Sequence, residues 1–151
     1  RLAGGCWICL RLKRTGIRPL PDIWQTRVTD LTAQLGIRHT VTVVTSAIAT
    51  VPMVVGVFKP VVLIPISTLI GLAPDQLEAI LIHELAHIRR YDNLVNLLQR
   101  VVETLFFFHP AVWWVSGRIR AGREHCCDDT AARASSPTRY ARALAALAEH
   151  R

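Results

Sequence analysis

The stretch PDQLEAILIHELAHIRRYDNL, residues 74–94, decides the fold of this chain. Apolar residues recur in it every three or four positions, and this spacing predicts a helix with one buried face. Pro74 suits the first position of such a helix, where a backbone N–H is not needed. The buried face is expected to consist of Leu77, Ile80, Leu81, Leu85 and Ile88. We therefore expect a long amphipathic helix packed against a hydrophobic core.

The same helix carries His83, Glu84 and His87 in the pattern HELAH. Two histidines four positions apart project from one helix face, so both imidazoles can reach a single Zn²⁺ at about 2.0–2.1 Å. Glu84 would lie beside that metal, where it can take a proton from the attacking water and later deliver one to a leaving amine. Polar side chains inside an apolar helix are costly to bury, and metal ligation compensates for that cost. Histidines satisfied within the core are the alternative interpretation.

A catalytic zinc site needs a third protein ligand and one open position. Glu124 is the candidate for that ligand, and Asp128 lies one helical turn later, where it can accept the second ring N–H of a ligand histidine. The alternative is that both carboxylates only neutralise arginines, namely Arg118, Arg120 and Arg123. Competing ligand types are His125, Cys126 and Cys127. However, His125 points about 100° away from Glu124 on a helix, and cysteine ligands would indicate a closed structural site.

The composition bounds the class of protein. The chain has 151 residues, of which 51% are hydrophobic and 19% charged, so it is expected to form one globular domain rather than a disordered segment or a coiled coil. Its 18 Lys and Arg residues outnumber 11 Asp and Glu residues, giving a net charge of +7. These basic residues are scattered and form no nucleic-acid motif, so we expect no nucleic-acid partner. The four cysteines are expected to be free thiols.

Short β-branched runs predict a small β-sheet before the HELAH helix. Residues 40–58 contain no charge, but valine and threonine dominate there and Pro52 and Gly56 interrupt the run, which favours strands over a membrane span. Residues 61–64 form a second run between Pro60 and Pro65, and these prolines are expected to confine it to an edge or to a short strand.

Helices are expected on both sides of these segments, over residues 22–35, 94–116, 118–134 and 138–150. Pro110 should end or kink the second of them. Its aromatic cluster is expected mainly in the core and only secondarily as an anchor at a membrane surface: Phe106, Phe107, Phe108, Trp113 and Trp114. The uncharged run 104–117 is short for a full bilayer crossing, and the sequence leaves open whether residues 94–116 lie in the bilayer, on it or in the core.

Residues 1–12 are expected to be the end of a membrane helix and a juxtamembrane segment, and residues 13–151 a zinc metallopeptidase domain from a longer membrane protein. Residues 2–10 are apolar, and Arg11, Lys13, Arg14 and Arg18 follow them. Lysine and arginine are enriched where a membrane helix emerges on the cytoplasmic side. A buried N-terminal helix of a soluble domain is the alternative.

With HELAH and the ExxxD pattern at 124–128 in view, the sequence resembles the BlaR/MecR-type membrane zinc peptidases. The likeness covers about residues 38–134 and includes GVFKPVVLIP (56–65), LAPDQLEAILIHELAHIRRYDNLVNLLQR (72–100), FFFHPAVWW (106–114) and REHCCDD (123–129). The resemblance implies a mainly helical, zincin-like α+β domain attached to membrane helices. It also implies one Zn²⁺ per chain with His83, His87 and Glu124 as ligands, Glu84 as catalytic base and Asp128 as support for a ligand histidine.

Further roles follow from the same resemblance. The segment GVFKPVVLIP should border the cleft and pair with an extended substrate, and its residues at the pairing edge are Gly56, Lys59 and Pro60. His109 would either donate to the oxyanion or pack at a helix end before Pro110. Asp92 is expected to form a structural salt bridge with Arg89 or Arg90.

The resemblance implies a membrane-associated zinc endopeptidase whose peptidase domain faces the cytoplasm. Its expected substrate is a protein or peptide, such as a cytoplasmic repressor or the chain itself, and membrane lipid is a further expected partner. Two alternatives stay open. One is a non-catalytic membrane signalling module with a structural zinc site, and the other is a membrane zinc peptidase of the prenyl-protein or heat-shock type.

Overall fold

A small mixed sheet and a set of longer helices make up the computed structural model, which describes residues 17–38 and 40–149. The strands are β1 (Ile17–Pro19), β2 (Thr42–Ser46), β3 (Met53–Val55) and β4 (Val61–Pro65). The helices are α2 (Asp22–Gln34), α3 (Ile66–Gly71), α4 (Pro74–Arg89), α5 (Asp92–Leu105), α6 (Pro110–Ser135) and α7 (Pro137–Glu149). The predicted α+β class, mainly helical with a small sheet before the HELAH helix, is confirmed.

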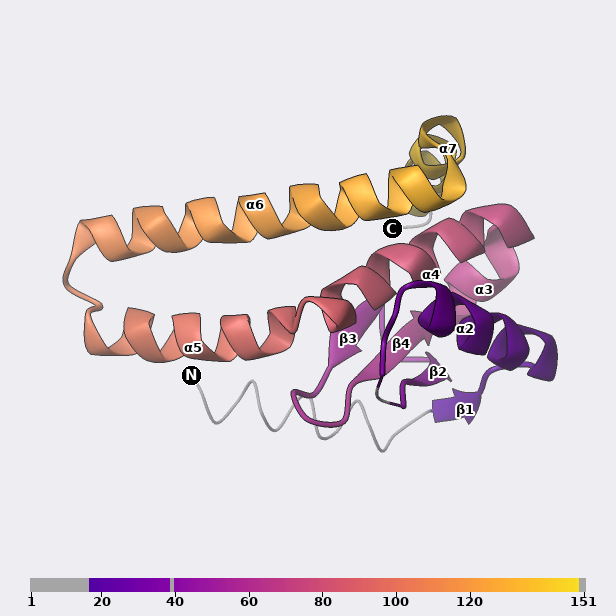
Figure 1. Cartoon of the computed structure of the whole chain (residues 1–151), viewed down its shortest axis with the longest axis horizontal. Helices are drawn as coiled ribbons and strands as arrows, with labels where there is room; N and C mark the ends of the chain where they lie inside the picture. Colours follow the sequence, from indigo (N-terminus) through magenta and orange to yellow (C-terminus); the bar gives the residue numbers. More distant parts are fainter. Residues whose placement is uncertain (1–16, 39, 150–151) are drawn as a thin grey trace.

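The sheet has the strand order β1-β2-β4-β3. β4 pairs in parallel with β2 and antiparallel with β3, so it is a central strand. The sequence allowed an edge position or a short strand here, and only the short strand is confirmed. Pro60 and Pro65 flank the paired residues, at positions where a missing N–H interrupts few ladder bonds. The edge strand next to α4 is instead β3 (Figure 1).

Helix α4 forms the centre of the domain, between the sheet and the C-terminal helices (Figure 1). All five residues of its predicted apolar face are buried, and they pack in one cluster with β4, α2, α6 and α7. Pro74 occupies the first turn, and the side-chain oxygen of Gln76 accepts a bond from the Ala73 N–H at 3.0 Å. A two-bond ion pair between Arg27 of α2 and Glu78 of α4, at 2.8 and 2.9 Å, ties α2 to the same framework.

Two helix boundaries differ from the sequence prediction. Tyr91 adopts the left-handed conformation with φ 56° and separates α4 from α5. The predicted helix 94–116 is in fact divided, since α5 ends at Leu105 and Pro110 begins α6 rather than kinking a longer helix. Proline is well accommodated in a first helical turn, so Pro110 can start a helix without interrupting it. That helix continues through the predicted 118–134 segment as α6.

The aromatic cluster between these helices is exposed, so its predicted core position is wrong. Phe107 and Trp114 keep 69% and 70% of their surface, and Phe106, Phe108 and Trp113 are also exposed. They lie where α5 and α6 form a hairpin that projects from the domain (Figure 1). Among residues 17–38 and 40–149, no helix combines the length and apolar character that a bilayer crossing requires. The expected membrane-helix end at residues 1–12 lies outside the described residues.

Candidate metal centre

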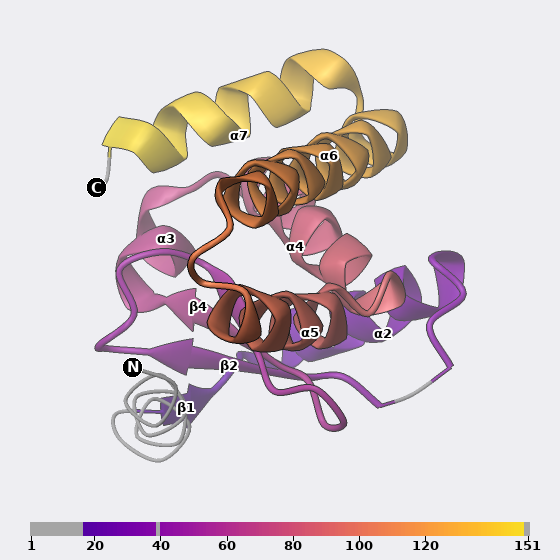
Figure 2. The same ribbon diagram turned by 90° about the vertical axis from the view of Figure 1, so that its left-hand side faces the viewer.

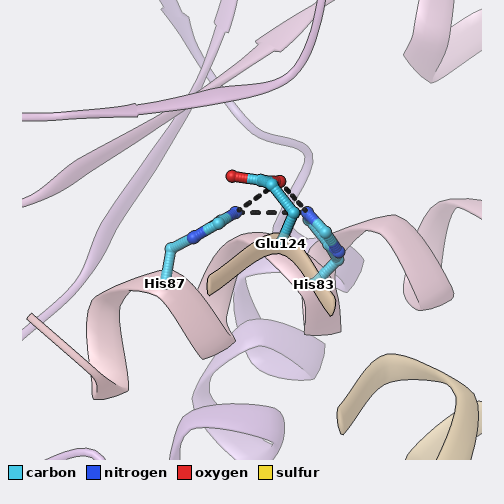
Figure 3. A group of neighbouring side chains, drawn as sticks. All are labelled: His83, His87 and Glu124. Carbon is cyan, nitrogen blue, oxygen red and sulfur yellow. Dashed lines mark hydrogen bonds and ion pairs between the residues drawn. The ribbon is translucent and has the colours of Figure 1, made fainter. Parts of the chain in front are cut away.

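Three side chains from two helices converge on one point above α4. His83 and His87 project from successive turns of α4, and their Nε2 atoms are 3.2 Å apart. Glu124 reaches toward them from α6, with its Oε2 atom 3.9 Å from His83 Nε2 and 3.8 Å from His87 Nε2 (Figure 3). The structure therefore brings together the three residues that the sequence predicted as zinc ligands.

The spacing of the donor atoms suits a zinc ion. In a tetrahedral site with bonds of about 2.1 Å, neighbouring ligand atoms lie about 3.4 Å apart. The separations of 3.2, 3.8 and 3.9 Å bracket that distance. Two imidazole nitrogens and one carboxylate are also the donor set of a catalytic rather than a structural zinc site, because they leave a fourth position open. The residues present thus fit the group that the sequence implies.

The other ring nitrogen of each histidine is held by a carboxylate. His87 Nδ1 lies 2.9 Å from Asp92 Oδ2, at the start of α5. His83 Nδ1 lies 3.1 Å from Asp128 Oδ1 and 2.8 Å from the Tyr140 hydroxyl, which donates its own proton to Asp128. Carboxylate acceptors favour the Nδ1–H form of both rings and direct the Nε2 lone pairs toward Glu124.

Burial keeps these supporting groups in the required protonation states. Burial and the neighbouring His87 ring lower the pKa of His83, which favours the neutral imidazole that a metal needs. Burial and the bond to Asp128 raise the pKa of Tyr140, so its hydroxyl stays protonated as a donor. The support of His83 therefore comes from two helices, α6 and α7.

Glu84 lies beside the cluster and is only 8% exposed. Removal from water raises the pKa of its carboxyl to about 7; the nearby Glu124 adds to this rise, while His87 opposes it. A carboxyl group whose pKa is near neutrality can both accept and return a proton under ordinary conditions. This is the property that the predicted general base requires.

A cleft of about 440 Å³ opens over the cluster. His83, Glu84, His87 and Glu124 line its floor, together with Asp92, Asp128 and Tyr140. Its apolar lining comes from β3, the loop before β3, α4 and α7: Val51, Pro52, Met53, Val54, Ile80, Leu144 and Leu147. The cleft therefore joins a candidate metal centre to the edge strand of the sheet.

The arginines near Glu124 have other partners. Arg123 is buried and donates to the Asp92 backbone carbonyl at 3.0 Å and to Asn96 Oδ1 at 2.6 Å, which fixes α6 against α5. Arg120 pairs with Glu103 at 3.1 Å. These contacts do not support the alternative in which Glu124 and Asp128 serve only to neutralise arginines.

Several residues singled out in the sequence lie away from the cluster. His109 is exposed and precedes α6 at the far end of the hairpin, so the structure does not bring it to the cluster. Its place before Pro110 agrees with the alternative helix-end role. His125 and Cys126 are exposed on α6.

The predicted substrate-pairing segment needs a correction. β4 already has a partner on each side, so it cannot accept a further strand. Gly56 and Pro60 line a separate small hollow beside the cleft, and Lys59 is exposed. The Gly56 carbonyl accepts a bond from the Asn93 side chain at 2.7 Å, which joins the β3–β4 turn to α5. Gly56 therefore supports the start of α5 from beside the cleft, and the strand edge at the cleft that is unpaired among the described residues belongs to β3.

The contacts of Asp92 and Tyr140 with the two histidines were not predicted from the sequence. Asp92 forms the expected ion pair with Arg90, whose Nε is 3.8 Å from Oδ1, and it lies closer still to His87 Nδ1, at 2.9 Å. A buried acid just after the helix that carries the histidines is the signal that was available. Tyr140 is 57 positions from His83, and no local pattern connects the two.

Cys127 is the neighbour of the Asp92–His87 pair. Its sulfur lies 3.4 Å from His87 Nδ1 and 3.6 Å from Asp92 Oδ2. Burial and the adjacent Asp92 charge raise the pKa of this thiol to about 12. The protonated thiol is a poor metal ligand, since the thiolate is the ligating form. Cys126 and Cys127 are both free thiols, as expected, while Cys6 and Cys9 lie outside the described residues.

A helix-borne histidine pair completed by a glutamate from a second helix defines a metallopeptidase-like domain. The chain belongs to the BlaR1 peptidase M56 family, whose model matches residues 11–151. It is similar to the regulatory protein BlaR1 of Bacillus licheniformis, with 30% identity over 77 residues. It is equally similar to the methicillin resistance mecR1 protein of Staphylococcus aureus, with 30% identity over 77 residues.

The predicted BlaR/MecR resemblance is thus confirmed. Each of these matches covers 51% of this chain and 13% of the relative. The chain therefore corresponds to a small part of the length of these curated relatives, and the family supports a regulatory, metallopeptidase-like domain.

Proposed function

We propose that this chain is the catalytic domain of a membrane-associated zinc endopeptidase that acts in regulatory proteolysis. The observation that carries the proposal is the convergence of His83, His87 and Glu124 within 3.9 Å, beside the buried Glu84. Family membership supports the peptidase class.

Each residue of the cluster has a separate role in the proposed hydrolysis. A zinc ion held by His83, His87 and Glu124 would polarise the peptide carbonyl and lower the pKa of a water molecule. Glu84 takes the proton from the attacking water and returns it to the leaving amine, for which a carboxyl pKa of about 7 is suitable. Asp92 and Asp128 hold the two imidazole rings in the orientation that ligation needs.

The substrate is proposed to bind as an extended strand along β3. This strand pairs only with β4 among the described residues, and it borders the cleft at Met53 and Val54. An extended peptide added to a free sheet edge gains main-chain hydrogen bonds in any sequence, while the cleft selects side chains. Leu144 and Leu147 of α7 with Val51 offer an apolar wall to those side chains.

The biological role is proposed from the relatives. They are named as a regulatory protein and a methicillin resistance protein, which fits cleavage of a cytoplasmic repressor or self-cleavage by a domain at the cytoplasmic membrane face. The basic residues that follow residue 10 support that orientation.

The test combines zinc content with cleavage. The purified chain, in detergent, is analysed for zinc per molecule and incubated with a proteome-derived peptide mixture that is read by mass spectrometry. The wild type should hold one zinc and cleave, Glu124→Ala should lose zinc, and Glu84→Gln should keep zinc but lose cleavage. Glu78→Gln, in the same helix but outside the cleft, is the matched control and should keep both.

Three outcomes would contradict the proposal. Cleavage by Glu84→Gln at the wild-type rate removes the general base. Equal zinc in the wild type and Glu124→Ala removes the third ligand. Stoichiometric zinc without cleavage of any peptide or of the chain itself favours the signalling module with a structural zinc site.

A further inference from the structure

The α5–α6 hairpin is built with its polar residues inside and its apolar residues outside. Gln99, Glu103 and Ser116 are buried between the two helices. The Gln99 amide donates to the Ser116 carbonyl at 3.2 Å, and Arg120 pairs with Glu103 at 3.1 Å. Water-soluble helix pairs bury the opposite set of residues, since apolar burial drives their packing.

Large apolar side chains are exposed along the hairpin from Leu94 to Val115. We call this set the apolar hairpin surface, and its members are Leu94, Leu97, Leu98, Val101, Val102, Leu105, Phe106, Phe107, Phe108, Trp113, Trp114 and Val115. The two helices form a hairpin (Figures 1 and 2). By helical periodicity most of the members on α5 lie on the side away from Glu103, and beyond Leu105 the set continues through the connecting turn into the first turns of α6. A monomeric soluble protein rarely exposes an apolar patch of this extent.

The charged side chains that are exposed around this surface, in residues 92–120, are all positive. Residues 104–117 contain no Asp, Glu, Lys or Arg. In residues 92–120 the two acids, Asp92 and Glu103, are buried, whereas Arg100, Arg118 and Arg120 keep exposed or half-exposed side chains. Exposed arginines next to apolar and aromatic residues match a bilayer surface with anionic headgroups.

We propose that the apolar hairpin surface inserts into one leaflet of a lipid bilayer that contains anionic lipids. α5 has 14 residues and is about 21 Å long, which is shorter than the hydrocarbon core of about 30 Å. The hairpin therefore enters the interfacial region and does not cross. Tryptophan is the residue type favoured at that depth, and arginine reaches from it to the headgroups.

A bilayer explains the surface better than a second copy of the chain. A self-complementary protein interface needs one patch that matches itself, whereas these exposed residues are distributed over α5, the connecting turn and the start of α6. Residues 92–120 expose arginines but no acid, so two copies packed through this surface would meet with charges of one sign. The inference is independent of zinc binding and of peptidase activity.

The test measures the depth of Trp113 and Trp114 in vesicles. Because residues 1–12 are themselves expected to belong to a membrane helix, vesicle binding alone is not the readout. Trp7 and Trp24 are replaced by Phe, so that fluorescence comes from Trp113 and Trp114. We expect a blue shift and strong quenching by lipids brominated near the headgroup in vesicles of phosphatidylcholine with phosphatidylglycerol, and weaker partition into phosphatidylcholine alone.

Paired substitutions make the result specific. Phe107→Ser, made in the same background, should weaken partition by about tenfold or more, because one large buried apolar side chain contributes at least that factor. Ile70→Ser is the matched control: Ile70 is 80% exposed on α3, away from the hairpin, and its substitution should leave partition unchanged. Both variants change exposed residues, and their far-ultraviolet circular dichroism should match the wild type.

Two results would overturn the inference. One is vesicle-bound chain in which bromolipids do not quench Trp113 and Trp114, since binding would then involve another segment. The other is a dimer in dilute detergent that Phe107→Ser dissociates and Ile70→Ser does not, which would identify a second copy as the occupant of the surface.

Discussion

Replacement of Asp92 gives the sharpest test of how the candidate metal centre is supported. The Asp92 carboxylate is nearly inaccessible to solvent, with 4% of its side chain exposed, and it lies 2.9 Å from His87 Nδ1. Asp92→Asn keeps the shape and an oxygen that can accept the Nδ1–H, but it removes the charge that makes the opposite nitrogen a stronger donor to metal. Asp92→Ala removes both.

The magnitude follows from this difference. Loss of a carboxylate that supports a ligand histidine weakens metal affinity by about 10- to 100-fold, or about 1.4 to 2.8 kcal/mol. We expect Asp92→Asn near the lower value and Asp92→Ala near the upper one. Asp128→Asn should have a smaller effect, because 42% of that side chain is exposed to screening solvent and the Tyr140 hydroxyl still contacts His83.

The assay is a competition titration with a chromophoric zinc chelator on the purified chain at neutral pH. The melting temperature of each metal-free variant shows that the measured affinity belongs to folded protein. An Asp92→Ala affinity within about threefold of the wild type would refute the role of Asp92 as support for a ligand. A larger loss in Asp128→Asn than in Asp92→Asn would refute the argument from burial.

Three further predictions concern groups around the cleft. The folded-state pKa of Glu84 is about 7, above its ordinary 4.5, so its contribution to the stability of the metal-free protein is fully present below pH 4.5 and is lost as pH rises through 7. Denaturant titrations should therefore show the unfolding free energy falling by at most about 3 kcal/mol from pH 5 to pH 8, with a smaller fall in Glu84→Gln. The same pH dependence in Glu84→Gln as in the wild type would contradict the assignment. Tyr140→Phe removes the bonds to His83 and Asp128 and should lower the unfolding free energy by about 1 kcal/mol, measured by urea denaturation, and an unchanged midpoint would show that these bonds add nothing. Iodoacetamide at neutral pH should label the exposed Cys126 in folded protein but should not label Cys127 until urea is added, because Cys127 is buried and its thiol pKa is raised to about 12. Equal labelling of both cysteines in mass spectra of the folded protein would contradict the burial of Cys127.

The sequence predicted the parts of the fold that depend on local periodicity. The α4 helix, its buried face and its first-turn proline were all readable, because a buried helix repeats apolar residues every three or four positions. The strands β2 and β4 were readable from their β-branched runs between prolines and glycines. The convergence of Glu124 with the two histidines was predictable once ligand chemistry was added to helix geometry.

Features that depend on the surroundings of a segment were not readable. The aromatic cluster at residues 106–114 was assigned to the core because large apolar side chains of a water-soluble protein are usually buried. On the α5–α6 hairpin these side chains are exposed instead. Pro110 permits a kink, an end or a beginning of a helix, and only the neighbouring turn selects the beginning. Tyr140 meets His83 because α7 folds back over α4, a tertiary contact without a local signature.

The division of the candidate ligands between two helices has a mechanical consequence. α4 supplies two ligands from the centre of the domain, whereas α6 supplies the third and runs on without a break to Pro110 at the end of the hairpin. The distance along α6 from that proline to Glu124 is about 21 Å. A metal ion bound by all three residues would link α6 to the core of the domain through α4. Because both histidines belong to α4, a displacement of the outer end of α6 would change the distance between Glu124 and the metal before it changed the distances to the histidines.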